Sequence, residues 1–208
     1  MTLRTYNRRR LARLAEESTL PKPANLKKPI DCYDFGFLVL CPEKNLGGFS
    51  TTVRSIKHNY PYAPILGIVG NNATQQEMDE MNSHSESIKG SNTITSLINV
   101  GMKNTKAPWN VIVFAGSWIR SSLYTKFDAF VKSEKDILFP VVDWHYNFVD
   151  GSMNGIILHR DTFAEVGDFP TDNVQQYEGG DLEFSKIWWA LGALEKGCVF
   201  KAIVGMKI

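Results

Sequence analysis

Residues 35–41 of this chain read FGFLVLC, an apolar run that ends at a proline. A run of this length without polar alternation is typical of a strand buried on both faces, as in a parallel sheet with helices on each side. Beyond a short loop, Phe49, Val53 and Ile56 recur at helical spacing until Pro61 ends the pattern. The opening of the chain therefore predicts a strand, a loop and a helix in that order.

The same alternation continues through the rest of the chain. Further strands are predicted at residues 64–69, 109–115, 137–142, 155–159 and 198–204, with at most a short one at 87–89. Further helices are predicted at residues 74–82, 94–101, 123–131, 161–166 and from 181 onward. Strands and helices that alternate at this spacing indicate right-handed crossovers and a mostly parallel sheet covered on both faces. The predicted fold class is α/β, and the less regular second half indicates a mixed sheet.

The composition is that of an ordinary globular chain, with 43% hydrophobic and 22% charged residues among 208. That length is sufficient for a buried core in one domain. No apolar run is long enough to cross a bilayer, and no apolar segment follows the basic N-terminus, so we expect neither a membrane span nor a secretory signal. The cysteines Cys32, Cys41 and Cys198 are odd in number and far apart, which fits a reduced compartment and a cytoplasmic location.

Positive charge is concentrated near the N-terminus. Residues 1–30 contain eight lysines and arginines against two glutamates, a net charge of +6, which leaves −5 for the remainder. We therefore expect a basic arm and linker at residues 1–30 and one folded domain at residues 31–208. Such an arm sometimes binds nucleic acid or an anionic membrane, but a solvated tail or an arm lying on its own acidic domain is commoner. The body lacks interleaved aromatic and basic residues, so no nucleic acid partner is expected.

A general rule of open sheets locates the candidate site before any chemistry is known. Ligands of such sheets bind outside the carboxyl ends of the strands. The rule selects the loops at residues 42–45, 70–72, 90–92, 115–118 and 143–145. It is a property of the architecture, and it does not identify a reaction.

The stretch at residues 177–192 reads YEGGDLEFSKIWWALG and predicts a helix from about Asp181. An apolar face follows from the spacing i, i+3, i+4 and i+7, and it is expected to pack on a core. Its members are Phe184, Ile187, Trp188 and Leu191. The two glycines allow a sharp turn and a close approach to a ligand. Asp181 therefore has two possible roles: an N-cap of the helix, or an acidic group that points at a bound ligand.

Together these segments resemble the nucleotide-sugar-dependent glycosyltransferases of the GT-A type, in particular the family 2 enzymes and the polypeptide N-acetylgalactosaminyltransferases. The resemblance covers about residues 35–204. It rests on the strand, loop and helix at 35–59, on FPVVD at 139–143, on NGIILHRDTF at 154–163 with GDF at 167–169, and on GGDLEFS at 179–185. It implies transfer of a sugar from a nucleotide-sugar donor, by default a UDP-hexose, to an unknown acceptor. A binding or structural module without turnover is the alternative. An unrelated Rossmann-like enzyme is disfavoured, because no G-x-G-x-x-G or P-loop follows the first strand.

The resemblance also implies roles for individual residues. Asp181 is the candidate catalytic carboxylate, which would take the proton of an attacking acceptor hydroxyl in an inverting transfer. Trp144 and His145 would line the acceptor side. The candidate residues for the nucleotide-sugar donor are Pro42, Glu43, Gly70, Asn71, Ser91, Asn92, Gly116 and Ser117.

One departure from the family pattern concerns the metal. GT-A enzymes usually carry Asp-x-Asp after the fourth strand, where a manganese or magnesium ion neutralises the donor diphosphate. Here residues 114–118 read FAGSW, without a carboxylate. Three explanations of the missing carboxylates stay open. The protein is a relative of these enzymes that has no activity, or it binds the metal elsewhere, through Asp143 and His145. Alternatively, a positively charged side chain takes the place of the metal on the diphosphate. The candidate cations are Arg120, Lys89 and Lys44.

Overall fold

The computed structural model describes residues 35–42, 46–141, 153–171 and 180–204. Its helices are α2 (Leu46–Asn59), α3 (Gln75–His84), α4 (Ile94–Asn104), α5 (Ser122–Phe130), α6 (Arg160–Val166) and α7 (Gly180–Glu195). Its strands are β1 (Phe35–Cys41), β2 (Ile65–Gly70), β3 (Glu86–Gly90), β4 (Trp109–Phe114), β5 (Asp136–Pro140), β6 (Ile156–His159) and β7 (Val199–Ile203). Every predicted strand and helix from residue 35 onward is present. The predicted N-terminal arm lies outside the described residues.

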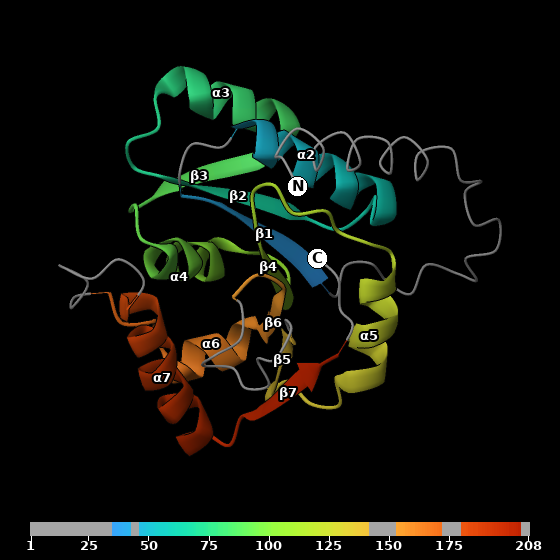
Figure 1. The fold of residues 1–208 in the computed structure, drawn as a ribbon, viewed down its shortest axis with the longest axis vertical. Helices are drawn as coiled ribbons and strands as arrows, with labels where there is room; N and C mark the ends of the chain where they lie inside the picture. Colours follow the sequence, from blue (N-terminus) through green and yellow to red (C-terminus); the bar gives the residue numbers. More distant parts are fainter. Residues whose placement is uncertain (1–34, 43–45, 142–152, 172–179, 205–208) are drawn as a thin grey trace, which may run out of the picture. The chain divides into compact units, whose positions relative to one another are not determined.

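The seven strands form one sheet in the order β3-β2-β1-β4-β6-β5-β7 (Figure 1). Strand β6 runs antiparallel to both of its neighbours, β4 and β5, and the other pairs are parallel. The predicted mostly parallel, mixed sheet is therefore confirmed. The antiparallel strand lies in the second half of the chain, where the sequence pattern is less regular.

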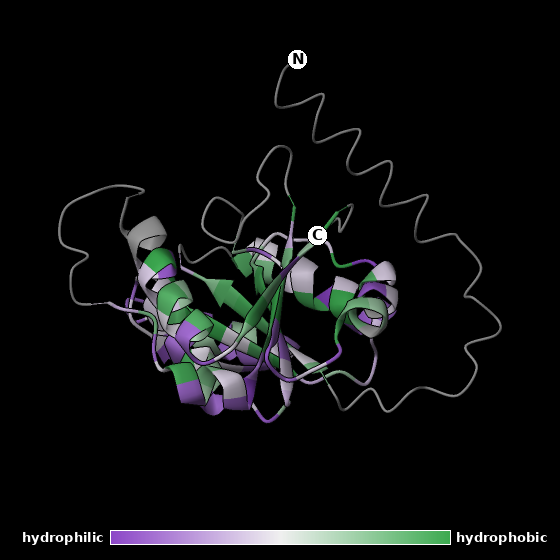
Figure 2. Ribbon diagram, turned by 90° about the horizontal axis from the view of Figure 1, so that it is seen from below, coloured by the Kyte–Doolittle hydropathy of each residue, from purple (hydrophilic) through white to green (hydrophobic). Residues whose placement is uncertain are grey.

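Each face of the sheet carries its own hydrophobic core. On one face, alternate residues of β1 such as Phe37 and Val39 pack with side chains of α2, α3 and α5. On the other face, Leu38 and Leu40 pack with side chains of α4, α6 and α7. Figure 2 shows the predominantly hydrophobic strands between the helices. The double burial explains why β1 is apolar throughout, because successive side chains of a strand point to opposite faces.

Helix α7 is rotated relative to the prediction. Trp189, Ala190 and Ala193 face the core, whereas Ile187 and Leu191 are 42% and 54% exposed and Trp188 is 63% exposed. The expected burial of the face with Ile187, Trp188 and Leu191 was therefore wrong. The helix is apolar on two sides, so spacing alone does not choose between them. The side with two alanines packs inward, since small residues allow close packing against α4 and α6.

Aromatic stacking and three hydrogen bonds to backbone groups attach α7 and the segment after α6 to the rest of the fold. The Trp189 ring stacks on Phe169 with centroids 4.5 Å apart, and its Nε1 donates to the Gly167 carbonyl at 2.8 Å. Phe169 is in turn held by Asn99 of α4, which is only 6% exposed. The Asn99 Nδ2 donates to the Phe169 carbonyl at 2.8 Å, and the Oδ1 accepts from the Phe169 N–H at 2.9 Å.

Replacing Asn99 should therefore destabilise the fold. In Asn99→Ala the N–H and carbonyl of Phe169 lose their partner in a buried setting, which should lower the free energy of unfolding by roughly 2–4 kcal/mol. Urea denaturation followed by circular dichroism measures the change. The matched control is Asn104→Ala on the same helix, where the exposed amide bonds only to the Val100 carbonyl of its own helix among the described contacts. The control should change stability by less than about 0.5 kcal/mol, and equal losses in both variants would contradict the role of Asn99.

Candidate functional site

The carboxyl ends of the parallel strands lie at one edge of the sheet. Strands β1, β2, β3 and β4 end at this edge in close register, with Cys41 opposite Val69 and Gly70 opposite Gly90. Strand β5 runs in the same direction as β4, because both are antiparallel to β6, and β7 is parallel to β5. Helix α7 leads into the start of β7, so it begins at the opposite edge, where the parallel strands end (Figure 1). The topology therefore brings the first turn of α7, which contains Asp181, to the same edge as the predicted donor loops. The Asp181 side chain lies outside the described part.

Three oxygen atoms converge on Gly70 at the end of β2. A Cβ added to this glycine would lie 2.4 Å from the Asn92 Oδ1, 3.2 Å from the Asn72 Oδ1 and 3.4 Å from the Pro42 carbonyl oxygen. The absence of a side chain at Gly70 therefore allows the ends of three strands to present hydrogen-bonding oxygens at one place. Pro42, Gly70 and Asn92, predicted separately as donor-binding residues, are brought together. Asn72 lies in the loop at residues 70–72 that the strand-end rule selected, but it was not among the residues assigned to the donor.

The remaining predicted residues of these loops occupy exposed positions at the same edge. Asn71 and Ser91 are exposed, and the Ser91 hydroxyl lies 3.4 Å from that of Thr93, the N-cap of α4. Lys89, a candidate diphosphate cation, donates from its Nζ to the Ala73 carbonyl at 2.6 Å. It therefore supports the turn after β2. The Arg120 carbonyl accepts from the Tyr60 hydroxyl at 2.6 Å, which fixes the backbone at that position.

The loop at residues 115–120, which the sequence resemblance aligns with the GT-A metal motif, is held by one side of α2. Thr52, which is fully buried, accepts at its Oγ1 from the Gly116 N–H and donates to the Ser117 carbonyl, both at 2.9 Å. The Ser55 hydroxyl accepts from the Ile119 N–H at 3.1 Å. The backbone of Gly116 has φ of 97°, a conformation that favours glycine. We call these contacts of Thr52 and Ser55 the α2 latch, and they give the loop a defined shape.

Asn154 is a residue of this edge that the sequence interpretation did not assign to the site. Its Oδ1 accepts from the Phe114 N–H at 3.0 Å, and its Nδ2 donates to the Ser117 hydroxyl at 3.0 Å. Asn154 precedes β6, and because β6 runs antiparallel to β4 its start lies beside the end of β4. An asparagine before an apolar strand was visible in the sequence, but the pairing of β6 with β4 was not.

The described residues of this loop do not fit the divalent metal that the resemblance to GT-A enzymes implied. Ala115, Gly116 and Ser117 offer no carboxylate, and the Gly116 N–H and Ser117 hydroxyl already have hydrogen-bond partners. Within the described ranges, no three His, Cys, Asp or Glu side chains are grouped closely enough to hold a metal ion. The other predicted positions, Glu43, Lys44, Asp143, Trp144 and His145, lie outside those ranges.

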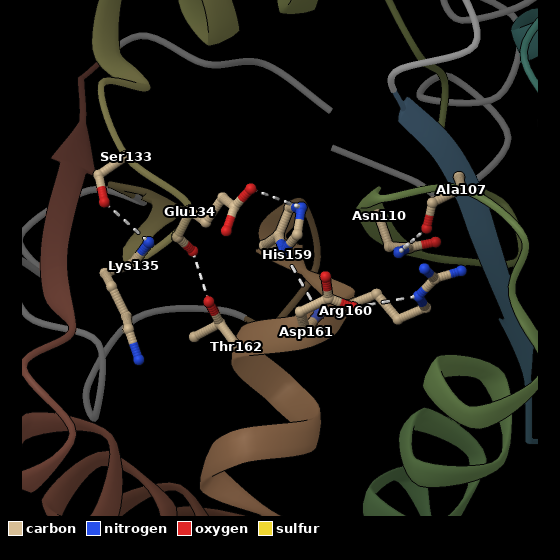
Figure 3. Close-up of polar contacts among 9 residues, drawn as sticks. All are labelled: Ala107, Asn110, Ser133, Glu134, Lys135, His159, Arg160, Asp161 and Thr162. Atoms are coloured by element: carbon tan, nitrogen blue, oxygen red, sulfur yellow. Dashed lines mark hydrogen bonds and ion pairs between the residues drawn. The ribbon is translucent and has the colours of Figure 1, made fainter.

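A second polar cluster lies at the opposite edge of the sheet, and its contacts are structural (Figure 3). His159 is buried at the end of β6, lies edge-on to the Trp109 ring and accepts at Nδ1 from the Asp161 N–H at 3.3 Å. It thereby caps helix α6. The Thr162 hydroxyl donates to the Glu134 carbonyl at 2.5 Å and holds the same helix against the start of β5.

Asp136, at the start of β5, is the buried carboxylate of that edge. Burial alone would raise its pKa, but a hydrogen bond from Lys201, two backbone N–H donors and the Lys201 charge together lower the pKa below its ordinary value. The Lys201 Nζ lies 2.7 Å from the Asp136 carboxylate. The folded protein therefore keeps Asp136 ionised to a lower pH than an unfolded chain does.

The α2 latch predicts a specific effect of removing one hydroxyl. Thr52→Val keeps the shape of the side chain but removes the donor to the buried Ser117 carbonyl, at a cost of roughly 1–3 kcal/mol in the free energy of unfolding. The Gly116 N–H loses its bond to Thr52 but still donates to the Gly48 carbonyl at 3.0 Å. Urea denaturation measures the cost. The control is Thr51→Val, where the lost hydroxyl donates to the Gly47 carbonyl of the same helix. A Thr52→Val protein as stable as this control would show that the latch does not hold the loop.

No protein-family model matches this chain. No curated protein matches it either. No described helix is both long and apolar enough to traverse a lipid bilayer.

Solved structures do resemble it in fold. The mannosyltransferase PcManGT of Pyrobaculum calidifontis, in complex with GDP-Man and Mn2+, is 11% identical with a TM-score of 0.62, over 94% of this chain and 61% of that one. A cytidylyltransferase of Leptospira borgpetersenii is 10% identical with a TM-score of 0.55, and the match covers 84% of this chain and 77% of that one. TarS of S. aureus, residues 1–349, is 12% identical with a TM-score of 0.53, and the match covers 76% of this chain and 56% of that one. The chain thus spans little more than half of two of these proteins. The likeness shows that it has the GT-A-like fold shared by glycosyltransferases and nucleotidyltransferases.

Proposed function

We propose that this chain is a glycosyltransferase that transfers a sugar from a nucleotide-sugar donor, by default a UDP-hexose, to an unknown acceptor. The observation that carries the proposal is the convergence of the Pro42, Asn72 and Asn92 oxygens on Gly70 at the carboxyl ends of β1, β2 and β3. Carbonyl and amide groups at strand ends are suited to the polar edge of a base and to ribose hydroxyls. The fold similarity to a GDP-Man-bound mannosyltransferase supports the same assignment.

In this proposal the edge of the sheet is divided between donor and acceptor. The nucleotide contacts Pro42, Glu43, Gly70, Asn71, Ser91 and Asn92. The donor diphosphate lies toward the loop with Gly116 and Ser117, whose shape the α2 latch maintains. Trp144 and His145 line the acceptor side.

Asp181 is the proposed general base. Its place in the first turn of α7 puts its backbone at the edge that holds the donor loops. Its carboxylate takes the proton of an acceptor hydroxyl while the hydroxyl oxygen bonds to the anomeric carbon. The bond from that carbon to the diphosphate breaks, and the nucleotide diphosphate leaves with the electron pair. A bound Mn or Mg ion would neutralise charge on the diphosphate, and Asp143 and His145 are the proposed pair to hold it.

A binding module without turnover is the second candidate. The observation that favours it is the loop at residues 115–117, which lacks carboxylates where the family places its metal ligands. The two candidates share the nucleotide site and differ in chemistry. Binding and turnover therefore have to be measured separately.

Nucleotide binding tests the site itself. We expect UDP, in preference to GDP or CMP, to raise the thermal unfolding temperature and to give a calorimetric binding isotherm. In Gly70→Ala the added Cβ displaces the Asn92 side chain, and we expect affinity to fall roughly tenfold, which corresponds to about 1.4 kcal/mol. Circular dichroism should stay unchanged, because the side chain displaced by the Cβ is exposed. The control is Gly47→Ala, where an added Cβ meets no atom within 4 Å. No response to any of the three nucleotides would remove the donor-binding proposal.

Catalysis is tested by release of UDP from UDP-glucose or UDP-galactose, measured with and without manganese. Asp181→Asn keeps the side-chain shape but cannot accept the proton, so the rate should fall roughly 100-fold or more while UDP affinity is retained. The control is Asp79→Asn on the exposed surface of α3, which should have no effect. Nucleotide binding with no turnover in the parent protein would favour the binding module, and an Asp181→Asn protein as active as the parent would reject Asp181 as the base.

A further inference from the structure

Two buried side chains of α7 bind the backbone of residues 167–170, the segment that follows α6. The Ser185 hydroxyl donates to the Pro170 carbonyl at 2.8 Å, and the Trp189 Nε1 donates to the Gly167 carbonyl at 2.8 Å. Ser185 and Trp189 are each 2% exposed. From the first contact to the second, α7 advances by four residues while the segment goes back by three. The helix and the segment therefore run antiparallel in a defined register.

The segment at residues 167–170 is itself held by α4. Asn99 binds both backbone groups of Phe169, and the Lys103 Nζ forms an ion pair with the Asp168 carboxylate. Phe169 is 2% exposed and belongs to the hydrophobic core of that face of the sheet. The carbonyls that α7 binds are therefore part of a fixed support.

The hydroxyl of Ser185 serves this attachment and not the helix that carries it. A serine inside a helix commonly donates to a carbonyl of the preceding turn, and alanine is the stronger helix former. Ser185 donates to a carbonyl 15 positions away in the sequence. Its hydrogen bond is therefore a tertiary contact, which fixes the rotation of α7 about its own axis.

Asp181 occupies the next position in the same series, one helical turn before Ser185. Positions 181, 185 and 189 are four residues apart, so they lie on one side of the helix. Among the described contacts, the Ser185 hydroxyl makes the hydrogen bond to another segment that lies closest to the beginning of α7. The direction in which the helix presents position 181 therefore depends on this contact.

We propose that Ser185 is a positioning residue for Asp181. Its hydrogen bond to Pro170 fixes the first turns of α7 and thereby the place of residue 181. The inference rests on the proposed function, in which Asp181 is the general base. A base acts only within hydrogen-bond reach of the proton that it takes, so the reaction rate is sensitive to its placement. Nucleotide binding is not, because the donor loops follow β1, β2 and β3.

The first test compares UDP release with UDP binding in Ser185→Ala. The rate of release at saturating donor should fall roughly tenfold, while the dissociation constant for UDP should change less than about twofold. Ser185→Thr keeps a hydroxyl and should recover most of the rate. The control is Ser83→Ala, which removes a hydroxyl that donates to the Glu80 carbonyl of its own helix α3, and it should match the parent. If the parent turns over and Ser185→Ala is equally fast, the positioning role is rejected and the proposed function stands.

Hydrogen–deuterium exchange of the full chain tests the same contact without turnover. The backbone amides of residues 185–188 donate within the first turns of α7. In Ser185→Ala they should exchange at least about fivefold faster, while the amides of β1 keep the parent rate, because the opening is local.

Two results of the exchange experiment overturn the proposal. Unchanged exchange in α7 would show that the hydroxyl does not fix the helix, and equal acceleration in α7 and β1 would show a loss of overall stability. A parent protein that releases no UDP rejects the proposed function instead. The exchange rates then decide by themselves whether Ser185 fixes the beginning of α7.

Discussion

Strand β1 has no exposed residue, and that constraint organises the fold. Its backbone is satisfied by β2 on one side and β4 on the other, and its two faces are covered by separate layers of helices. Parallel neighbours require crossover connections, so every strand from β1 to β4 is followed by a loop at the same edge. The candidate site is a consequence of this burial, because it collects those loops.

Much of this arrangement could be predicted from the sequence, since the deciding signals are local. Each of these signals shows how one strand or helix is buried, without reference to its neighbours. Examples are the apolar run at residues 35–41 and the helical spacing of Phe49, Val53 and Ile56. The rotation of α7 could not be predicted, because the helix is apolar on two sides and only the neighbouring helices decide which side is buried. Asn154 was missed for a related reason: its neighbours depend on the pairing of β6 with β4, which is a non-local property.

Chemistry was harder to infer than architecture. The edge of the sheet brings Pro42, Gly70 and Asn92 together as expected from the strand ends. The loop after β4, where the resemblance to GT-A enzymes implied metal-binding carboxylates, instead has hydrogen bonds to Thr52 and Asn154. A loop whose N–H groups are bonded within the fold has little freedom to rearrange around an ion.

The double hydrogen bond between Asn99 and Phe169 connects α4 to α7 through one aromatic residue. The Asn99 amide holds both backbone groups of Phe169, and the Phe169 ring stacks on Trp189 of α7. Helix α4 follows the loop with Ser91 and Asn92. A movement of α4 must therefore either break these two hydrogen bonds or carry the Phe169 ring along with it against Trp189.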